Sequence, residues 1–167
     1  MYTIDGYSLF RNDGQSNNTT RPSGGTAVYS RIQFIPGHPY REMIMKCMYT
    51  PHITIIGVYR SPKVPITLFC IALREVLSHL ATQYSVFIGD FNLNWVNETD
   101  KVPLYNLFIT EHNYRQLVSL YTTDNKTAID HIYTNLSESE IQLHLLEIYF
   151  SDHKSICALI NCFNTER

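Results

Sequence analysis

The sequence predicts a single α/β domain whose sheets are largely antiparallel or mixed. Seven or so short segments have the composition of β-strands, and two longer segments have apolar residues at helical spacing. One of the helical segments lies between two strand candidates, as in a strand-helix-strand unit. The 167 residues are enough for one domain with a sizeable core, and no repeat or long linker divides residues 1–167.

The first part of the chain contains a polar loop followed by three strand candidates. Residues 12–25 are rich in Gly, Ser, Asn and Thr, which is typical of a surface loop. The strand candidates that follow are 26–34, 42–49 and 52–60. The last of them is almost continuously apolar, which indicates a strand covered on both faces.

The second part of the chain alternates helices and strands. A helix is expected over residues 65–80, because its apolar residues Phe69, Leu73, Val76 and Leu77 share one face and Pro65 is tolerated in a first turn. A second helix is expected over residues 103–112. The strand candidates are 84–90, 116–121, 128–134, 141–150 and 154–163, the last two separated by the polar break Ser151-Asp152-His153.

Composition and charge exclude several classes of protein. Hydrophobic residues make up 44% and charged residues 17% of the chain, as in globular domains. With 13 basic and 15 acidic residues the net charge is -2, so bulk positive charge cannot hold a nucleic acid, and a phosphate-bearing partner needs a local site or a metal. The four cysteines lack metal-binding spacing, no apolar run approaches the roughly 20 residues of a membrane helix, and no signal peptide is visible. We therefore expect an intracellular protein.

Polar residues of catalytic type follow several of the predicted strands. Taken singly, each has an ordinary structural explanation, and the Gly-Asp-Phe-Asn stretch at 89–92 is typical of a tight turn. The alternative is that Asp90 and Asn92 share one face of an extended chain while Phe91 points into the core. Together the polar strand ends favour a functional rim of the sheet. They are Tyr59-Arg60, Asp90-Phe91-Asn92, Asp130-His131 and Asp152-His153.

These residue types suit the hydrolysis of phosphoesters. A histidine acts as acid or base near neutral pH, and an aspartate can fix its tautomer and orientation. Carboxylate and amide oxygens are hard ligands that suit Mg²⁺ or Mn²⁺ better than zinc. A bound cation neutralises the charge that develops on phosphate while an aspartate activates water.

Five motifs, in this order along the chain, resemble those of the endonuclease/exonuclease/phosphatase superfamily, which has the DNase I-like fold. Within it, the sequence is most similar to the endonuclease domains of non-LTR retrotransposons and related mobile elements. The resemblance implies a four-layer α/β sandwich. The motifs are GGTAVYSR (24–31), GVYRSP (57–62), FIGDFNLNW (87–95), AIDHIYTN (128–135) and FSDHKSI (150–156).

The resemblance also implies roles for individual residues near the first two strand ends. Tyr59 matches the tyrosine that contacts the scissile phosphate, and Arg60 is its companion in substrate binding. Asp90 matches the carboxylate that orients or deprotonates the attacking water, and we expect it to contribute to the metal site. Asn92 helps to hold the phosphate.

The other matched residues come from the last two motifs. Asp152 matches a metal-site carboxylate, and His153 matches the imidazole that stabilises charge developing on the phosphate. Asp130 matches the acid that hydrogen-bonds this histidine. His131 lies on the opposite strand face, is not part of the motif, and is expected to be structural.

Two earlier motifs of the superfamily have no counterpart in this sequence. They are an asparagine on the first strand and a metal-binding glutamate on the next strand. Glu42 and Glu75 are poor substitutes, because one opens a later strand candidate and the other lies on the predicted helix. We therefore expect an incomplete sandwich that lacks its N-terminal strands, a weakened metal site, and an unpaired sheet edge that favours self-association.

The functional prediction is metal-dependent hydrolysis of phosphodiesters, with DNA as substrate and Mg²⁺ or Mn²⁺ as cofactor. The location is nuclear if the substrate is chromosomal DNA and cytoplasmic otherwise. A catalytically inactive remnant of the same fold, able to bind nucleic acid weakly, is one alternative. An inositol or lipid phosphatase of the same superfamily is another.

Overall fold

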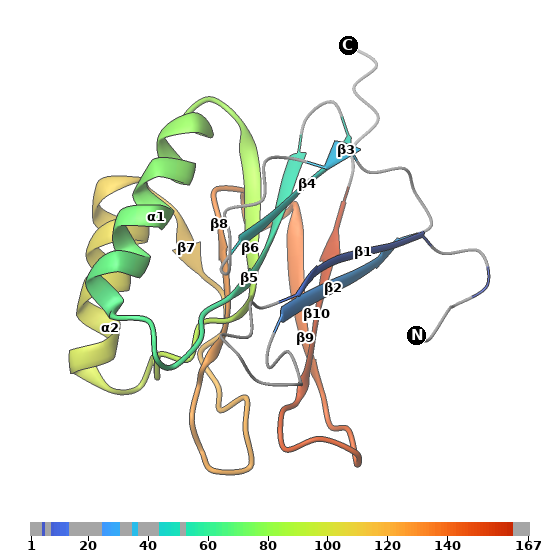
Figure 1. The fold of residues 1–167 in the computed structure, drawn as a ribbon, viewed down its shortest axis with the longest axis vertical. Helices are drawn as coiled ribbons and strands as arrows, with labels where there is room; N and C mark the ends of the chain where they lie inside the picture. The colour runs from blue at the N-terminus through green and yellow to red at the C-terminus, as the bar shows by residue number, and fades with distance from the viewer. Residues whose placement is uncertain are drawn as a thin grey trace.

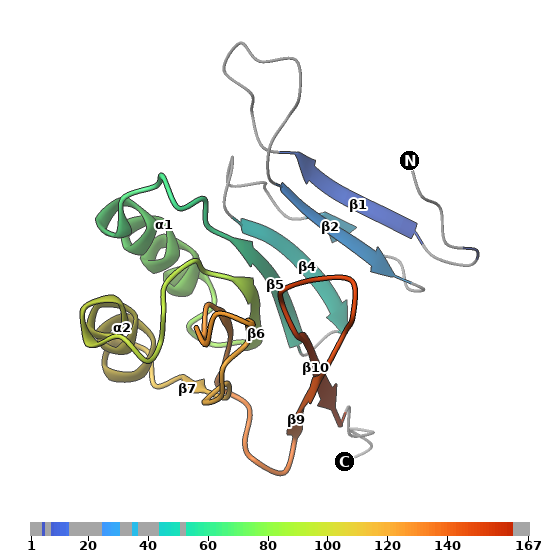
Figure 2. The same ribbon diagram turned by 90° about the horizontal axis from the view of Figure 1, so that it is seen from below.

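The computed structural model describes Asp5 and residues 8–13, 25–30, 35–36, 44–50 and 53–161. In these residues a central β-sheet has helices on one face and two β-hairpins on the other (Figures 1 and 2). The layers of helices, central sheet and hairpins confirm the predicted α/β class. Within the described residues, no helix has the length and apolar character needed to cross a membrane.

The central sheet has six strands in the order β3-β4-β5-β6-β8-β7. Strands β5 and β6 are parallel, and every other neighbouring pair is antiparallel, so the sheet is mixed. The parallel pair needs a crossover, which helix α1 (Ile66–His79) supplies on the helix-covered face. The strands are β3 (Ile35–Pro36), β4 (Ile44–Thr50), β5 (Ile53–Tyr59), β6 (Tyr84–Asp90), β7 (Arg115–Gln116) and β8 (Asp130–Thr134).

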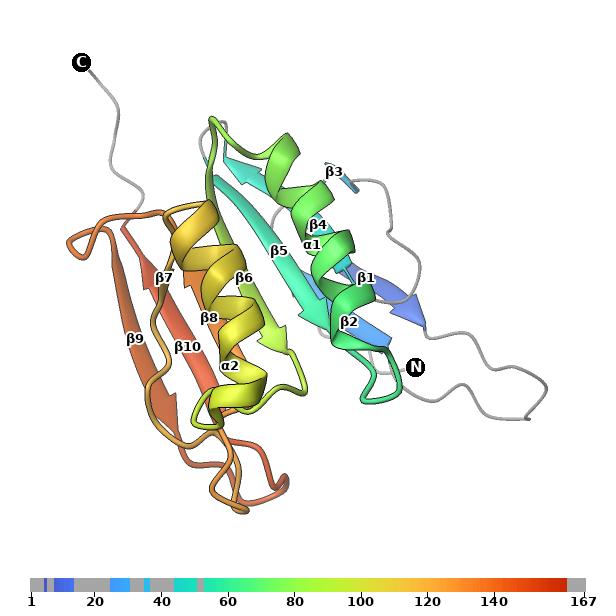
Figure 3. The ribbon, with the colours of Figure 1, turned by 90° about the vertical axis from the view of Figure 1, so that its left-hand side faces the viewer.

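Two separate antiparallel hairpins form the second β-layer. One joins β1 (Ser8–Asp13) to β2 (Gly25–Ser30), and the other joins β9 (Ile141–Leu146) to β10 (Ser155–Ile160). Figure 3 shows the helices in front of the central sheet and both hairpins behind it. Each hairpin is a sheet of two strands, so among the described residues each of its strands has one edge without a partner strand.

The central sheet separates two hydrophobic cores, and the alternation of side chains along β6 assigns residues to each. Phe87 points toward the helices, where aromatic rings pack around Phe91 and Phe108 in both edge-to-face and stacked contacts. Val86 and Ile88 point toward the hairpins, into an aliphatic core. Because side chains alternate, Asp90 falls on the hairpin side of the sheet.

The two predicted helices exist, but the second begins earlier than expected. Helix α1 buries Phe69, Leu73, Val76 and Leu77, the face predicted from their spacing. Helix α2 (Glu98–Leu104) starts five residues before position 103 and continues as the π-helix η1 (Tyr105–Glu111). Asn97 caps it by accepting hydrogen bonds from the backbone N–H groups of Thr99, at 2.9 Å, and Asp100, at 3.3 Å. This cap sets the start, so Pro103 lies inside the helix.

The strand predictions differ from the structure mainly at the ends of the elements. Strand β6 has the predicted bounds, whereas the candidate at 116–121 contributes only Gln116 to the short β7. Strand β1 was not predicted, because its sequence is mostly polar. The loop expected over 12–25 is wrong at both ends, since Asn12 and Asp13 belong to β1 and Gly25 to β2, and residues 14–24 lie outside the described residues. Parts of the expected strands, at 31–34, 42–43, 52 and 162–163, lie outside the described residues.

Candidate active site

Three polar residues stand in register across three neighbouring strands. Tyr59 at the end of β5 pairs with Asp90 at the end of β6, and Asp90 pairs with Asp130 at the start of β8. All three positions alternate with residues of the hairpin-side core, such as Ile88 and Ile132, so their side chains share that face of the sheet. The central sheet therefore ends in one row of a phenol and two carboxylates.

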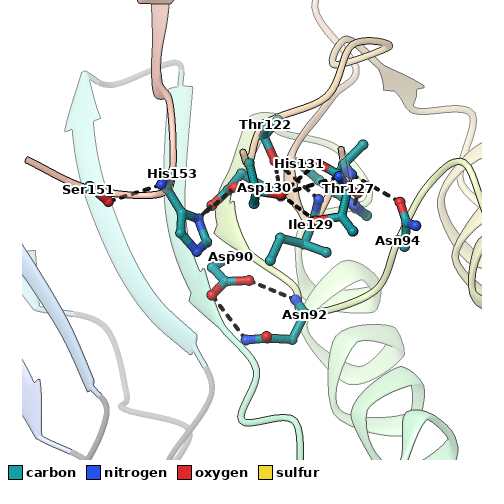
Figure 4. Close-up of polar contacts among 12 residues, drawn as sticks. Asp90, Asn92, Asn94, Thr122, Thr127, Ile129, Asp130, His131, Ser151 and His153 are labelled. Carbon is teal, nitrogen blue, oxygen red and sulfur yellow. Dashed lines mark hydrogen bonds and ion pairs between the residues drawn. The ribbon is translucent and has the colours of Figure 1, made fainter. Parts of the chain in front are cut away.

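His153 reaches this row from the hairpin layer, two residues before β10. Its Nδ1 lies 2.9 Å from Asp130 Oδ2 and 3.1 Å from Asp130 Oδ1 (Figure 4). An ionised carboxylate can only accept a hydrogen bond, so Nδ1 carries the proton and donates a hydrogen bond to Asp130. The other ring nitrogen, Nε2, points away from Asp130. The predicted pair of Asp130 and His153 is thus assembled from two different β-layers.

Asp90 and Asn92 are brought together by a turn. The Asn92 backbone N–H donates to Asp90 Oδ1 at 2.8 Å, and the Asn92 side-chain Nδ2 donates to Asp90 Oδ2 at 3.0 Å. Strand β6 ends at Asp90, and Asn92 has a left-handed φ of 49°. The two side chains therefore meet, as expected, but in a turn and not on one face of extended chain, because an aspartate side chain can itself close a turn. Phe91 is buried among the helix-side rings, as predicted.

Gly89 allows β6 to approach β5 closely just before this turn. Its φ is 146°, a conformation that side-chain-bearing residues rarely adopt. A Cβ atom at this position would lie 1.9 Å from the Val58 carbonyl oxygen. Glycine is therefore required for Asp90 to leave the strand at this point.

Arg60 supports the same turn through hydrogen bonds to its backbone carbonyls. The side chain is only 5% exposed, and its Nε donates to the Phe91 carbonyl at 2.7 Å. The other two guanidinium nitrogens donate to the carbonyls of Val64 and Asn92, and the group lies over the Phe69 ring. Burial lowers the pKa of Arg60, against the charges of nearby aspartates that raise it. The sequence-based expectation was substrate contact, whereas every nitrogen of the guanidinium group is bonded to the protein backbone.

The loop between β7 and β8 connects Asp130 to the His153 segment. Thr122 Oγ1 accepts from the backbone N–H groups of Ile129 and Asp130, both at 3.2 Å. The Thr122 carbonyl accepts from the Lys154 backbone N–H at 2.8 Å, and Thr123 forms a β-bridge with His153. Thr122 is not recognisable as a site residue from the sequence, because a threonine in a loop belongs to no periodic pattern or motif. Its role depends entirely on the tertiary contact.

The electrostatics of the row favour a cation. Ligand atoms of Asp90, Asp130 and His153 all lie within 4.8 Å of one another, and this is the single group of three such residues among those described. Burial raises the pKa of Asp90, helped by the charge of Asp130 and opposed by the hydrogen bonds from Asn92. Burial by itself would lower the pKa of His153, but the charge and hydrogen bond of Asp130, with Asp90 and Asp152, outweigh it and raise that pKa.

Asp152 and Glu75 lie outside this group. Asp152 is exposed, and its backbone carbonyl accepts from the Asp124 N–H at 3.0 Å. Its carboxylate contributes to the raised pKa of His153 without joining the group of three, so its part in metal binding stays a prediction. Glu75 is exposed on α1, on the other face of the sheet, as expected of a poor substitute. Glu42 lies outside the described residues.

Solved structures with a similar fold include an endonuclease domain, a toxin and an endonuclease/exonuclease/phosphatase family protein. The endonuclease domain of TRAS1, a telomere-specific non-LTR retrotransposon, is 18% identical with a TM-score of 0.72, over 94% of this chain and 79% of that one. The Haemophilus ducreyi cytolethal distending toxin is 12% identical with a TM-score of 0.65, over 92% and 68% of the two chains.

An endonuclease/exonuclease/phosphatase family protein from Leptotrichia buccalis is 14% identical with a TM-score of 0.62, over 95% and 72% of the two chains. No protein-family model and no curated protein matches this sequence. The likeness therefore lies in the fold, and it agrees with the resemblance carried by the five sequence motifs. The chain has the DNase I-like fold that these solved structures share.

Proposed function

We propose that this protein is a divalent-metal-dependent phosphodiesterase that cleaves DNA. The observation that carries the proposal is the contact of His153 Nδ1 with Asp130, 2.9 Å long, beside Asp90 at one end of the sheet. A histidine oriented by one carboxylate and placed next to a second, half-buried carboxylate is an arrangement for moving protons during hydrolysis.

Asp90 is the proposed general base. Its half-buried position raises its pKa, which makes it a stronger base than an exposed aspartate. Asn92 holds both carboxylate oxygens, through its backbone N–H and its side-chain amide, so the carboxylate has one orientation. Asp90 in this position takes a proton from a water molecule aligned with the phosphate.

His153 is the proposed stabiliser of charge on the phosphate. Asp130 accepts the Nδ1 proton and raises the pKa of His153, so the imidazolium form persists to higher pH than in a free histidine. A protonated Nε2 donates to a phosphate oxygen as negative charge builds up there. Asp130 thus acts on the reaction through His153.

Tyr59 and Asn92 are proposed to hold the substrate, and Arg60 to position them. Tyr59 lies in the same register row as Asp90 and Asp130, half-buried, and its hydroxyl can donate to the scissile phosphate. Asn92 Nδ2 already donates hydrogen bonds to Asp90 and to the Arg60 carbonyl, so a hydrogen bond to phosphate would compete with these two. For Arg60 we replace substrate contact with support of the 90–92 turn, because its donors face backbone carbonyls.

The donor set of the site fits a hard divalent cation. Asp90 and Asp130 supply carboxylate oxygens, which Mg²⁺ and Mn²⁺ prefer. These residues would hold the ion, with Asp152 at the exposed margin. When bound, the cation neutralises charge on the phosphate that this chain, with a net charge of -2, does not neutralise by itself.

A mobile-element origin is part of the same proposal. Its support is the order of the five motifs and the likeness of the fold to the retrotransposon endonuclease domain. Self-association is also proposed, since strands of both hairpins have an edge without a strand partner in the described residues. Light scattering of the purified chain measures it directly, and a monodisperse monomer would contradict it.

One observation favours the non-catalytic alternative. Among the described residues, the group that can hold a metal contains two aspartates and a histidine, and no glutamate joins it. Asp130 also directs both of its oxygens to His153, and both oxygens of Asp90 accept hydrogen bonds from Asn92. A remnant of the fold that binds nucleic acid without cleaving it would have this same geometry.

A nicking assay on supercoiled plasmid separates the two functions. With Mg²⁺ or Mn²⁺ the wild-type chain is expected to produce open circles, and Asp90→Ala and His153→Ala are each expected to reduce the rate about 100-fold or more. Glu75→Ala, which removes an exposed carboxylate from the far face, is the matched control and keeps full activity. Absence of nicking with either metal supports the remnant. Phosphate release from inositol phosphates without nicking supports a phosphatase.

A further inference from the structure

Two aromatic rings stand in solvent directly before the Ser151-Asp152-His153 segment. Tyr149 is 102% and Phe150 is 88% exposed, and among the described residues no other large apolar side chain exceeds the 63% of Leu120. Both rings belong to the loop between β9 and β10. They are therefore the most exposed apolar groups in the described part of the chain, and they lie within four residues of a site residue.

The base of this loop is firmly attached next to the site. The Asp152 carbonyl accepts from the Asp124 N–H at 3.0 Å, and the Lys154 N–H donates to the Thr122 carbonyl at 2.8 Å. The loop between β7 and β8 is thereby tied to the loop between β9 and β10. Figures 1 and 3 show both loops projecting beyond the same end of the central sheet, the end at which β6 finishes.

The chemistry of this surface suits a nucleic acid strand. Aromatic side chains stack on the faces of nucleobases, and this contact tolerates any base sequence. Lys126 is exposed at the tip of the neighbouring loop and forms no ion pair with the described residues, so its charge is available to a phosphate. Aromatic rings that stack on bases and a cation that contacts the backbone are the two kinds of contact that proteins commonly make with a single nucleic acid strand.

We propose that Tyr149 and Phe150 stack on bases that flank the phosphate bound at Asp90, Asp130 and His153. The choice of nucleic acid as ligand rests on the proposed function. The rings are binding residues and take no part in the chemical step. They supply the affinity that a chain with negative net charge does not obtain from bulk electrostatic attraction.

The test measures binding without cleavage. Fluorescence anisotropy in EDTA follows a labelled 20-nucleotide single strand and, separately, the same strand in a fully paired duplex. The double variant Tyr149→Ala/Phe150→Ala is expected to raise the dissociation constant for the single strand about tenfold or more, since each stacked base contributes roughly a 5- to 150-fold factor in affinity. The conservative variant Tyr149→Phe/Phe150→Tyr is expected to stay within about twofold of wild type, because it keeps both rings.

A matched control removes an exposed ring elsewhere. Tyr84 is 51% exposed at the start of β6, the opposite end of the strand from Asp90, so Tyr84→Ala should leave binding unchanged. Dissociation constants that are equal in wild type and the double alanine variant overturn the inference. So does wild-type protein that binds neither oligonucleotide, or a dimer that the double variant converts to monomer.

The outcome is distinguishable from the fate of the proposed function. Ring-dependent binding together with no metal-dependent nicking means that the proposed function fails and the binding surface stands. If Asp90→Ala abolishes nicking but the double alanine variant binds as well as wild type, the proposed function stands and the binding surface fails.

Discussion

Two histidines follow an aspartate in this chain, and the central sheet places them on opposite faces. His131 is fully buried on the helix side, where it stacks on Phe91 with ring centroids 4.9 Å apart. Its ring nitrogens lie 2.9 Å from the Ala128 carbonyl oxygen and 3.0 Å from the Tyr133 hydroxyl. His153 is half-buried on the hairpin side and pairs with Asp130.

The same dipeptide therefore has two electrostatic outcomes. Burial lowers the pKa of His131 to about 4, whereas the surrounding carboxylates raise the pKa of His153. The alternation of side chains along β8 decides which histidine meets the carboxylates, because residues 130 and 131 point to different faces of the sheet. The helix-covered face of the sheet is built for packing, and the hairpin-covered face carries the candidate chemistry at its end.

The largest loss of stability is expected from a change at Gly89, because the packing of both faces of the sheet depends on this residue. Gly89→Ala places a Cβ atom 1.9 Å from the Val58 carbonyl oxygen and requires a φ of 146° from a residue that resists it. The free energy of unfolding in urea should fall by about 4 kcal/mol or more, at the upper end for single substitutions. Ser78→Ala, on the exposed side of α1, is the control and should change it little. A variant as stable as wild type would mean that β5 and β6 are more loosely paired than described.

His153→Ala sharpens the comparison from the side of activity. Loss of the imidazole should lower the rate of metal-dependent plasmid nicking about 100-fold or more. Its free energy of unfolding should change by less than about 1 kcal/mol, because the pair with Asp130 is partly exposed to solvent. Urea denaturation beside the nicking assay checks both values. A large loss of stability would show that the His153 side chain has a structural role.

His131→Ala should give the opposite pattern. Removing a fully buried ring leaves a cavity beside Phe91 and unpaired polar groups at Ala128 and Tyr133, at a cost of about 3 kcal/mol in the free energy of unfolding. Under conditions where the variant remains folded, its nicking rate should stay within a few-fold of wild type. A nicking rate as low as that of His153→Ala in folded protein would remove the distinction between the two faces.

The pH dependence of stability should also differ in sign between the two histidines. The pKa of His131 is depressed, so its contribution is complete above about pH 6.5 and is lost as the pH falls toward 4, by about 3 kcal/mol. The pKa of His153 is raised, so its contribution is complete below about 6.5 and is lost as the pH rises through its folded pKa. Urea denaturation of His131→Phe and His153→Gln across pH 4 to 9 measures each. Parallel curves for wild type and both variants would contradict the assignment.

The smallest effect is expected at the start of α2. Asn97→Ala removes the side chain that caps Thr99 and Asp100, which should cost about 1 kcal/mol of stability without altering nicking. Thermal melting and the plasmid assay on the same preparation test it. Altered nicking would show that the helix-covered face also influences the site.

Much of the site was predictable from sequence because it depends on strand ends and side-chain alternation. Strand β6 has the expected bounds, and the pairing of Asp130 with His153 was expected from the resemblance. What was missed depends on contacts between distant segments. A buried guanidinium with carbonyl partners, such as Arg60, and a hydroxyl that binds the backbone of another loop, such as that of Thr122, leave no periodic signal. The Asn92 turn was misjudged because a short polar stretch fits both extended chain and turn.

The register of Tyr59, Asp90 and Asp130 has a consequence for how the proposed activity would be lost. These residues belong to segments as far as 71 positions apart, and each is carried by a different strand of one sheet. A shift of β8 by a single residue would put the His131 side chain where Asp130 now stands. No local fragment contains the row, so it vanishes as soon as any one of the three strands detaches. Loss of nicking on heating should therefore coincide with melting of the whole sheet. The nicking assay would then report on cooperative unfolding.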